Sequence, residues 1–387
     1  MINLISAIHR LYPPHSQSKR TVEVLARTSH GPHVRDTFSL HLAMRRMVVA
    51  LMPCVLVALY NTGLQANLNL AMLGTTSASG WRGGVLDLLG VGYNPASIVS
   101  TVLHGALYFL PVFVVSLAIG DFWERVFATV RNRPRCEGIL VLALMFSLLL
   151  PPSIPLWQVA LGMSFGVIIG QEIFGGTGKS VLNPALAGLA FLYVTYPKEM
   201  IMESSWTVPD AFTKATYLSF AKQQKPEVLD WIATSWEVAF LGFTPGGFGT
   251  TSVVACLLGA GFLLYTRTVS GRIILSVMVG MVLCTVAFNK LGSDAFASLT
   301  WYWHLSLGSF AFGMVFLATD QGTSAMTDRG RWIYGLLVGS LIVLIRVANS
   351  HHPDGVMFAI LLGNIFAPLI DYLVMRADIR RRARRYG

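Results

Sequence analysis

The sequence predicts an all-α, polytopic membrane protein with about ten transmembrane helices. The chain has 387 residues, of which 54% are hydrophobic and only 12% are charged, and its mean hydropathy is +0.59. An ordinary soluble domain carries about 25% charged residues, so this deficit indicates a membrane protein. Two further observations agree: apolar segments recur along the whole chain, and basic residues gather at their ends.

Ten apolar segments are candidates for membrane spans, since a hydrocarbon core needs about twenty apolar residues per helix. The third and fifth segments are short and bounded by proline and glycine, which predicts broken helices that line a site. The segments are 46–64, 98–120, 137–150, 155–173, 182–197, 250–266, 271–289, 300–319, 331–349 and 355–375.

The basic residues predict the sidedness of the chain. The formal net charge is +10, but span ends explain the placement of these residues, so we expect no nucleic-acid partner. The positive-inside rule puts both termini and every second connection in the cytoplasm; outside, only the 65–97 connection holds an arginine, Arg82. The expected organisation is a cytoplasmic segment 1–45, a transmembrane domain 46–375 with a periplasmic loop 198–249, and a basic cytoplasmic tail 376–387.

An internal repeat is indicated by two similar motifs. Trp157 begins WQVALGMSFG and Trp303 begins WHLSLGSFAFG, and each motif precedes a glycine-rich cytoplasmic connection. If the repeating unit has five spans, the second copy enters the membrane from the opposite face. The alternative is coincidence between two glycine-rich packing faces.

The GGTGKS motif at 175–180 invites comparison with a phosphate-binding loop. That motif requires a glycine at position 173, where this chain has Ile173. We therefore expect a tight glycine turn that leads into the fifth span at Asn183. The Asn183 amide either caps this helix or forms a hydrogen bond with a bound ring.

The four cysteines, Cys54, Cys136, Cys256 and Cys284, are scattered, which favours small buried side chains over a metal site or disulfide.

Carboxylates at membrane depth are candidate functional groups, because burying them is costly. Asp371 lies inside the tenth span and Glu124 lies at the cytoplasmic end of the second, while Glu172 and Asp320 end the fourth and eighth. The alternative for each is an end residue that snorkels or pairs with an arginine.

Two phenylalanines in the eighth span and one arginine in the ninth are further residues of interest. Phe312 and Phe316 share a helix face, so they serve either in packing or as a hydrophobic gate in an ion path. We expect Arg346, near the outer end of the ninth span, to snorkel toward water.

Five motifs resemble, in order and over nearly the whole chain, the family of B subunits of the Na⁺-translocating NADH:quinone oxidoreductase. They are HVRDTFSLHLAMRRM, GDFWE at 120–124, IFGGTGKSVLNPALAG, FAFGMVFLATD at 310–320 and APLIDY at 367–372. The related D subunit of the Rnf ferredoxin:NAD complex is shorter at its front. After Asp320 the family usually continues Pro-Val, where this chain has Gln321 and Gly322.

The resemblance implies a membrane component of a six-subunit complex in the bacterial inner membrane, with the A, C, D, E and F subunits as partners. That complex passes electrons from NADH to ubiquinone and exports Na⁺. The implied fold is two inverted five-helix repeats, similar to urea and ammonium channels. The implied cofactors are riboflavin and an FMN that a flavin transferase attaches covalently to a threonine. No NADH site is visible, so NADH oxidation is expected on a partner.

The flavin-attachment motif of the family matches residues 210–216. Thr216 matches the threonine that carries FMN, with Asp210, Thr213, Lys214 and Ala215 as the rest of the motif. Lys214 replaces the usual glycine, and its ammonium group could pair with the flavin phosphate.

The remaining matches concern quinone, riboflavin and sodium. Gly120, Asp121 and Glu124 match the quinone region, although Asp121 replaces a second glycine. Asn183 matches a riboflavin contact, and Asp371 matches a carboxylate linked to sodium uptake. No residue of this chain is assigned as a catalytic acid, base or nucleophile. The alternative functions are a D-type Rnf subunit and a passive channel or transporter on the same scaffold.

Overall fold

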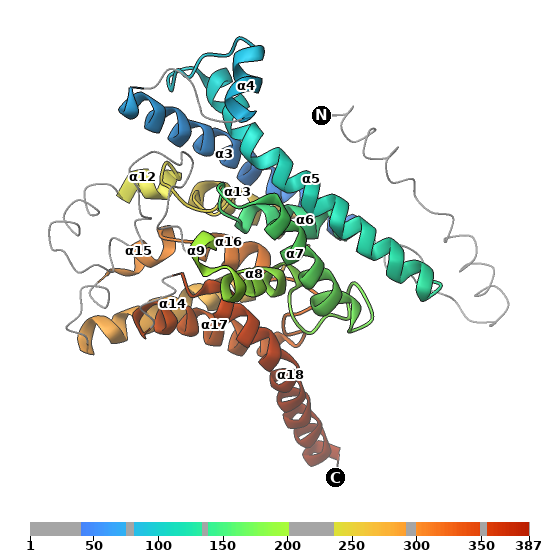
Figure 1. Ribbon diagram of the computed structural model, residues 1–387. Coiled ribbons are helices and arrows are strands. Elements are labelled where there is room, and N and C mark those ends of the chain that lie inside the picture. Colours follow the sequence, from blue (N-terminus) through green and yellow to red (C-terminus); the bar gives the residue numbers. More distant parts are fainter. Residues whose placement is uncertain are drawn as a thin grey trace.

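The computed structural model describes residues 40–74, 81–133, 138–200, 236–291, 299–348 and 354–386, and all the regular structure in these ranges is helical. Five helices are long and apolar enough to cross a membrane: α3 (Leu40–Leu73), α5 (Ile98–Val130), α14 (Gly271–Leu291), α17 (Asp328–Ala348) and α18 (Val356–Tyr386). Figure 1 shows them as long rods around a core of shorter helices.

The shorter helices complete the predicted set of ten segments. Three are apolar: α6 (Ile139–Leu149), α8 (Pro184–Thr195) and α13 (Val253–Tyr265). Helix α7 (Leu156–Phe165) continues into the π-helical segment η1 (Gly166–Glu172). The eighth predicted segment is broken into α15 (Trp301–Ser306), α16 (Phe310–Phe312) and the π-helical η2 (Gly313–Leu317). Three small helices, α4 (Trp81–Leu88), α9 (Pro197–Met200) and α12 (Trp236–Leu241), lie in connections.

The closest helix pairs, α3 with α5 and α14 with α17, are built on glycine. A Cβ atom on Gly105 of α5 would overlap the carbonyl oxygen of Leu59 in α3. A Cβ atom on Gly339 of α17 would overlap the carbonyl oxygen of Val277 in α14. Contact between backbones at small residues is the usual way in which membrane helices associate, because lipid gives no hydrophobic drive between them.

Helix α6 ends inside the protein and depends on a distant loop for its hydrogen bonds. Its 11 residues extend about 17 Å, roughly half of a hydrocarbon core. Pro151 and Pro152 follow and have no N–H group. The amides of Phe248 and Gly249 donate to the carbonyls of Leu150 and Leu148, at 3.1 and 2.8 Å. The connection into α13 therefore satisfies backbone groups that water cannot reach.

The two motifs that indicated a repeat have the same irregular local structure. The Trp157 motif runs into η1 and the Trp303 motif runs into η2, and each segment leads to a carboxylate, Glu172 or Asp320. The second copy differs by its break at Gly308, which has φ +72°.

The connections gather into two groups, as the charge pattern predicted. Among the described residues, two hydrogen bonds join parts of the chain assigned to one side and two join parts assigned to the other, which agrees with the predicted even number of spans. The contacts are Arg46 with Thr266 and Asn183 with Asp320 on the first side, and Gln65 with Phe243 and Trp236 with Tyr302 on the second.

Candidate functional site

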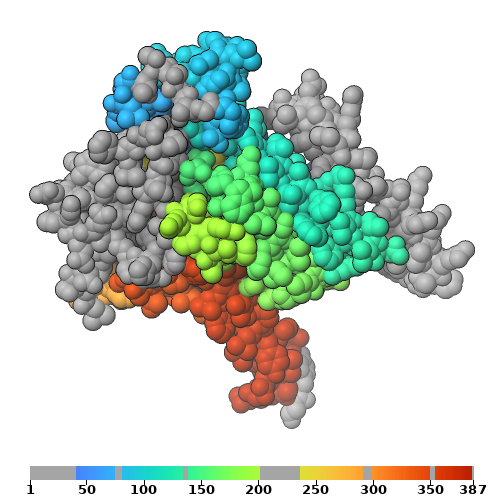
Figure 2. Space-filling view, in the orientation of Figure 1, coloured from blue at the N-terminus to red at the C-terminus, as the bar shows by residue number. Residues whose placement is uncertain are grey.

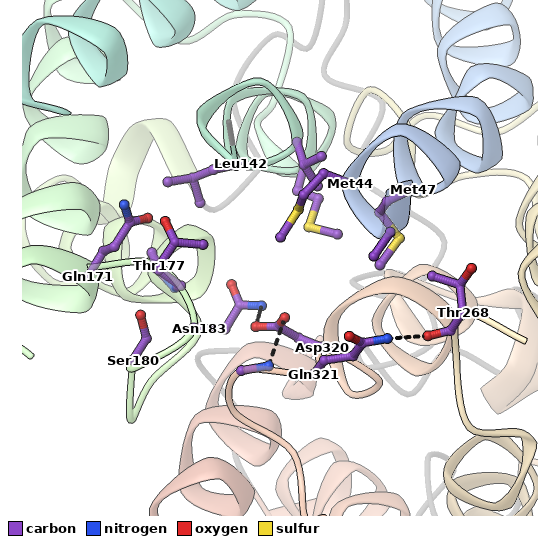
Figure 3. A pocket seen from close by; sticks show the side chains of 17 residues that line it. Met44, Met47, Leu142, Gln171, Thr177, Ser180, Asn183, Thr268, Asp320 and Gln321 are labelled. Carbon is purple, nitrogen blue, oxygen red and sulfur yellow. Dashed lines mark hydrogen bonds between the residues drawn. The ribbon is translucent and has the colours of Figure 1, made fainter. Parts of the chain in front are cut away.

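A pocket of about 260 Å³ lies where the two halves of the chain meet. One wall is apolar and comes from α3 and α6, with Met44, Met47 and Leu142 (Figure 3). The opposite wall is polar and comes from the glycine turn, the start of α8 and the connection after η2. The short α6 and α8 line it, as the sequence predicted for its two broken spans.

Asn183 joins the two halves at the polar wall. Its Oδ1 accepts hydrogen bonds from the amides of Ala185 and Leu186, at 3.0 and 3.4 Å, and so caps α8. Its Nδ2 donates to Oδ2 of Asp320 at 3.4 Å (Figure 3). The capping role predicted for Asn183 is therefore confirmed, and its partner across the pocket is one that sequence reasoning missed.

Asp320 is the one carboxylate among the described residues that line the pocket, and none of them is a lysine or arginine. It lies in the connection after η2 and accepts from the Gly322 amide at 3.3 Å and the Thr323 hydroxyl at 3.2 Å. Burial raises the pKa of the Asp320 carboxyl above its usual value, although these two hydrogen bonds act in the opposite direction. Gln321 donates to the Thr268 carbonyl, a bond that a proline at position 321 could not make.

A buried cluster of charges borders the pocket. Nη2 of Arg133 lies 2.7 and 2.8 Å from the two oxygens of Glu172 and 3.3 Å from both oxygens of Glu124. The two carboxylates are 0% and 1% exposed. Arg131 lies 3.5 Å from Glu172, and Gln171, which also lines the pocket, donates to both glutamates at 3.4 Å. Both glutamates thus pair with arginine, the alternative that the sequence left open.

The glycine turn lies against this cluster. Gly175, Gly176 and Gly178 have φ values of +110°, +98° and +83°, which favour glycine strongly. A Cβ atom on Gly176 would overlap the guanidinium of Arg133. The motif is therefore the tight glycine turn that the sequence predicted.

The three residues predicted for the quinone region, Gly120, Asp121 and Glu124, lie in different environments. A Cβ atom on Gly120 would lie 2.6 Å from the methyl group of Met163, so glycine lets α5 pack closely on α7. Asp121 is half-buried and pairs with the exposed Arg125. Glu124 of the same helix points inward to the charge cluster.

Asp371 lies outside the pocket and caps another helix. Its carboxylate accepts from the amides of Met326 and Thr327, at 2.7 and 3.0 Å, at the start of α17. The partner of this carboxylate is therefore a helix N-terminus, not an arginine.

Phe312 and Phe316 are fully buried, with ring centroids 5.0 Å apart. A Cβ atom on Gly259 of α13 would lie 2.7 Å from the Phe316 ring, so this ring packs between η2 and α13. The same Cβ position would lie 2.6 Å from the carbonyl oxygen of Ala50 in α3, so Phe316 lies beside the contact of α13 with α3, and neither phenylalanine lines the pocket.

The prediction that Arg346 reaches toward water is wrong. Arg346 does not snorkel, because its side chain is 0% exposed. Its guanidinium donates to the carbonyls of His304 and Leu307 at 2.7 and 2.8 Å, at the C-terminal end of α15. It also pairs with Asp354 at 3.2 Å, and Asp354 in turn accepts from the Ser309 amide at 3.0 Å. The Arg346–Asp354 pair thus holds both sides of the break in the eighth segment.

The predicted flavin-attachment residues lie between α9 and α12, outside the described residues. They are Asp210, Thr213, Lys214, Ala215 and Thr216.

An all-helical bundle with several membrane-crossing helices, half-length helices and a pocket between its halves defines a polytopic membrane protein. The chain belongs to the NQR2, RnfD, RnfE family, whose sequence profile matches residues 27–380.

Three relatives show the extent of the similarity, and each is named as the B subunit of a Na(+)-translocating NADH-quinone reductase. The protein of Chromohalobacter salexigens is 47% identical over 360 residues, which cover 92% of this chain and 87% of that protein. That of Azotobacter vinelandii is 45% identical, with 97% and 91% covered. That of Pseudomonas aeruginosa strain PAO1 is 44% identical, with 97% and 92% covered.

Proposed function

We propose that the chain is the B subunit of a Na⁺-translocating NADH:quinone oxidoreductase. The observation that carries this proposal is the 44–47% identity, over 92–97% of the chain, to proteins of that name. The setting is a bacterial inner membrane with both termini in the cytoplasm and loop 198–249 in the periplasm. The partners are the other subunits of the complex, ubiquinone and a flavin transferase.

The pocket at Asn183 is the proposed riboflavin site. Its methionine and leucine wall suits the face of a flat ring, while Asn183, Ser180 and Gln171 offer hydrogen bonds to polar ring edges. Its volume lies near the lower end of small-molecule sites, about 300 Å³. The described lining residues include the carboxylate of Asp320 but no lysine or arginine, so they would repel a phosphate group rather than bind it. This lining favours riboflavin, which has no phosphate, over FMN.

FMN is proposed on Thr216 through a phosphoester bond. A covalent tether would prevent loss of the cofactor outside the cytoplasm, and a long polar loop would present the hydroxyl to the transferase. A bound flavin supplies the electron-transfer chemistry that amino-acid side chains lack.

Quinone and sodium are proposed to use other parts of the chain. Gly120, Asp121 and Glu124 contribute to the quinone region, and Asp371 contributes to the Na⁺ path, because Na⁺ prefers hard oxygen ligands. The gate formed by Phe312 and Phe316 stays a prediction, which their full burial and the position of Phe316 beside the contact of α13 with α3 favour.

The test of the flavin assignment is ultraviolet fluorescence of the denatured chain in a gel, after co-expression with the flavin transferase. A bright band that disappears in Thr216→Ala but persists in Thr213→Ala is expected. A dark wild-type band, or a bright Thr216→Ala band, would contradict the assignment. Ferredoxin-dependent rather than NADH-dependent turnover of the whole complex would favour the Rnf-type reading, and a flavin-free chain would favour a passive channel.

A further inference from the structure

Helix α18 continues well beyond the tenth membrane segment as a strongly basic rod. The predicted span ends at residue 375, yet the helix runs to Tyr386 and projects from the body of the molecule (Figures 1 and 2). At about 1.5 Å per residue, this extension reaches about 16 Å past the hydrocarbon core. Its arginines, all exposed, are Arg376, Arg380, Arg381, Arg382, Arg384 and Arg385.

The extension has few partners within the part of the chain that the structure describes. Its last ion pair joins Asp378 to Arg329 at 3.4 Å, and both side chains are largely exposed. No ion pair is found there for the six arginines of the extension. Four of them lie beyond residue 380, where the match to the family profile ends.

The arrangement of the arginines around the helix identifies their partner. Successive residues of an α-helix are rotated by about 100°, so these six side chains cover an arc of about 240°. A folded protein partner contacts one face of a helix, whereas the attraction of an anionic membrane surface acts on basic side chains all around a helix that leaves it. Ile379 and Ala383 occupy the remaining arc, and Ile379 is exposed.

We propose that the 376–385 extension binds the headgroups of anionic phospholipids in the leaflet from which it emerges. The headgroup layer is about 5–7 Å thick on each side, so Arg376 and Arg380 lie at headgroup depth. The arginines beyond them lie within a Debye length, about 8 Å, of the charged surface. Guanidinium groups form paired hydrogen bonds with phosphate oxygens. The proposal does not depend on the redox function.

The test is native mass spectrometry of the delipidated full-length chain, titrated in detergent micelles with phosphatidylglycerol or phosphatidylcholine. We expect tighter binding of phosphatidylglycerol. In the variant Arg376→Gln/Arg380→Gln, that affinity falls about fivefold for each arginine, as the attraction of one basic residue near an anionic surface requires. Arg376→Lys/Arg380→Lys keeps most of the preference.

The matched control is Lys198→Gln/Lys290→Gln, which removes the same charge from exposed lysines outside the extension. We expect this control to bind phosphatidylglycerol as the wild type does. An equal loss in both double variants would overturn the proposal, as would displacement of the lipid by excess inorganic phosphate, which would indicate an anion site only. Unchanged lipid binding with loss of co-purifying subunits would assign the extension to a protein partner.

Discussion

Replacing Arg346 by methionine removes a buried cation without leaving a large cavity. The guanidinium donates to the carbonyls of His304 and Leu307 and pairs with Asp354. Methionine fills similar space but donates no hydrogen bond. The variant thus leaves two carbonyls at the end of α15 without their donor and removes the charge partner of Asp354.

The expected loss in the free energy of unfolding is about 3 kcal/mol. Each buried carbonyl left unsatisfied costs about 1–3 kcal/mol. Breaking a fully buried ion pair costs about 3–5 kcal/mol. Asp354 is 32% exposed and keeps its hydrogen bonds from Ser309, so breaking the Arg346–Asp354 pair costs less than this. Lysine at position 346 keeps the charge but cannot donate hydrogen bonds to both carbonyls and to Asp354 in the way the guanidinium does. We therefore expect Arg346→Lys to lose about half as much unfolding free energy as Arg346→Met.

The assay is reversible unfolding of the full-length chain in mixed micelles, followed by the loss of helical ellipticity. Arg329→Met is the control, because its side chain is 62% exposed and its ion pair contributes at most about 1 kcal/mol. If Arg346→Met loses no more stability than this control, the argument that Arg346 holds the helix break is wrong.

Three further variants test the pocket and its border. Arg133→Gln leaves Glu124 and Glu172 without their shared cation and should lower the free energy of unfolding by about 3 kcal/mol or more. Adding Glu172→Gln should recover part of this loss, and unfolding midpoints that do not recover would contradict charge pairing. Gly176→Ala should destabilise by about 1–3 kcal/mol, because alanine disfavours a φ of +98° and would overlap Arg133, whereas an unchanged midpoint would show that the turn adapts. Asn183→Ser keeps a side-chain oxygen that can cap α8 but removes the amide donor to Asp320, so stability should stay within about 1 kcal/mol while extractable, non-covalent flavin falls; full retention of that flavin would remove Asn183 from the proposed site.

The features that the sequence predicted well depend on neighbouring residues. Apolar length marks the spans, and the helix cap at Asn183 and the glycine turn at 175–178 follow from local chemistry. The alternation of charge between connections agrees with the hydrogen bonds that join described connections.

The features that the sequence did not predict depend on residues far apart in the chain. Asn183 and Asp320 are separated by 137 positions, and Arg133 reaches Glu172 over 39. Arg346 was misread because its position near a span end suggests water, while its true partners are carbonyls of another helix. Asp371 was placed at membrane depth, but the amides of Met326 and Thr327 become its partners only when α17 packs on α18.

The loop that caps α6 has a consequence for biogenesis. The carbonyls of Leu148 and Leu150 receive their donors from Phe248 and Gly249, which are synthesised long after α6 has entered the membrane. Until then these carbonyls face the interior of the membrane without those donors, at a cost of several kcal/mol each in a medium without water. The end of α6 therefore obtains its full set of hydrogen bonds only after the connection into α13 has been synthesised and has packed against it.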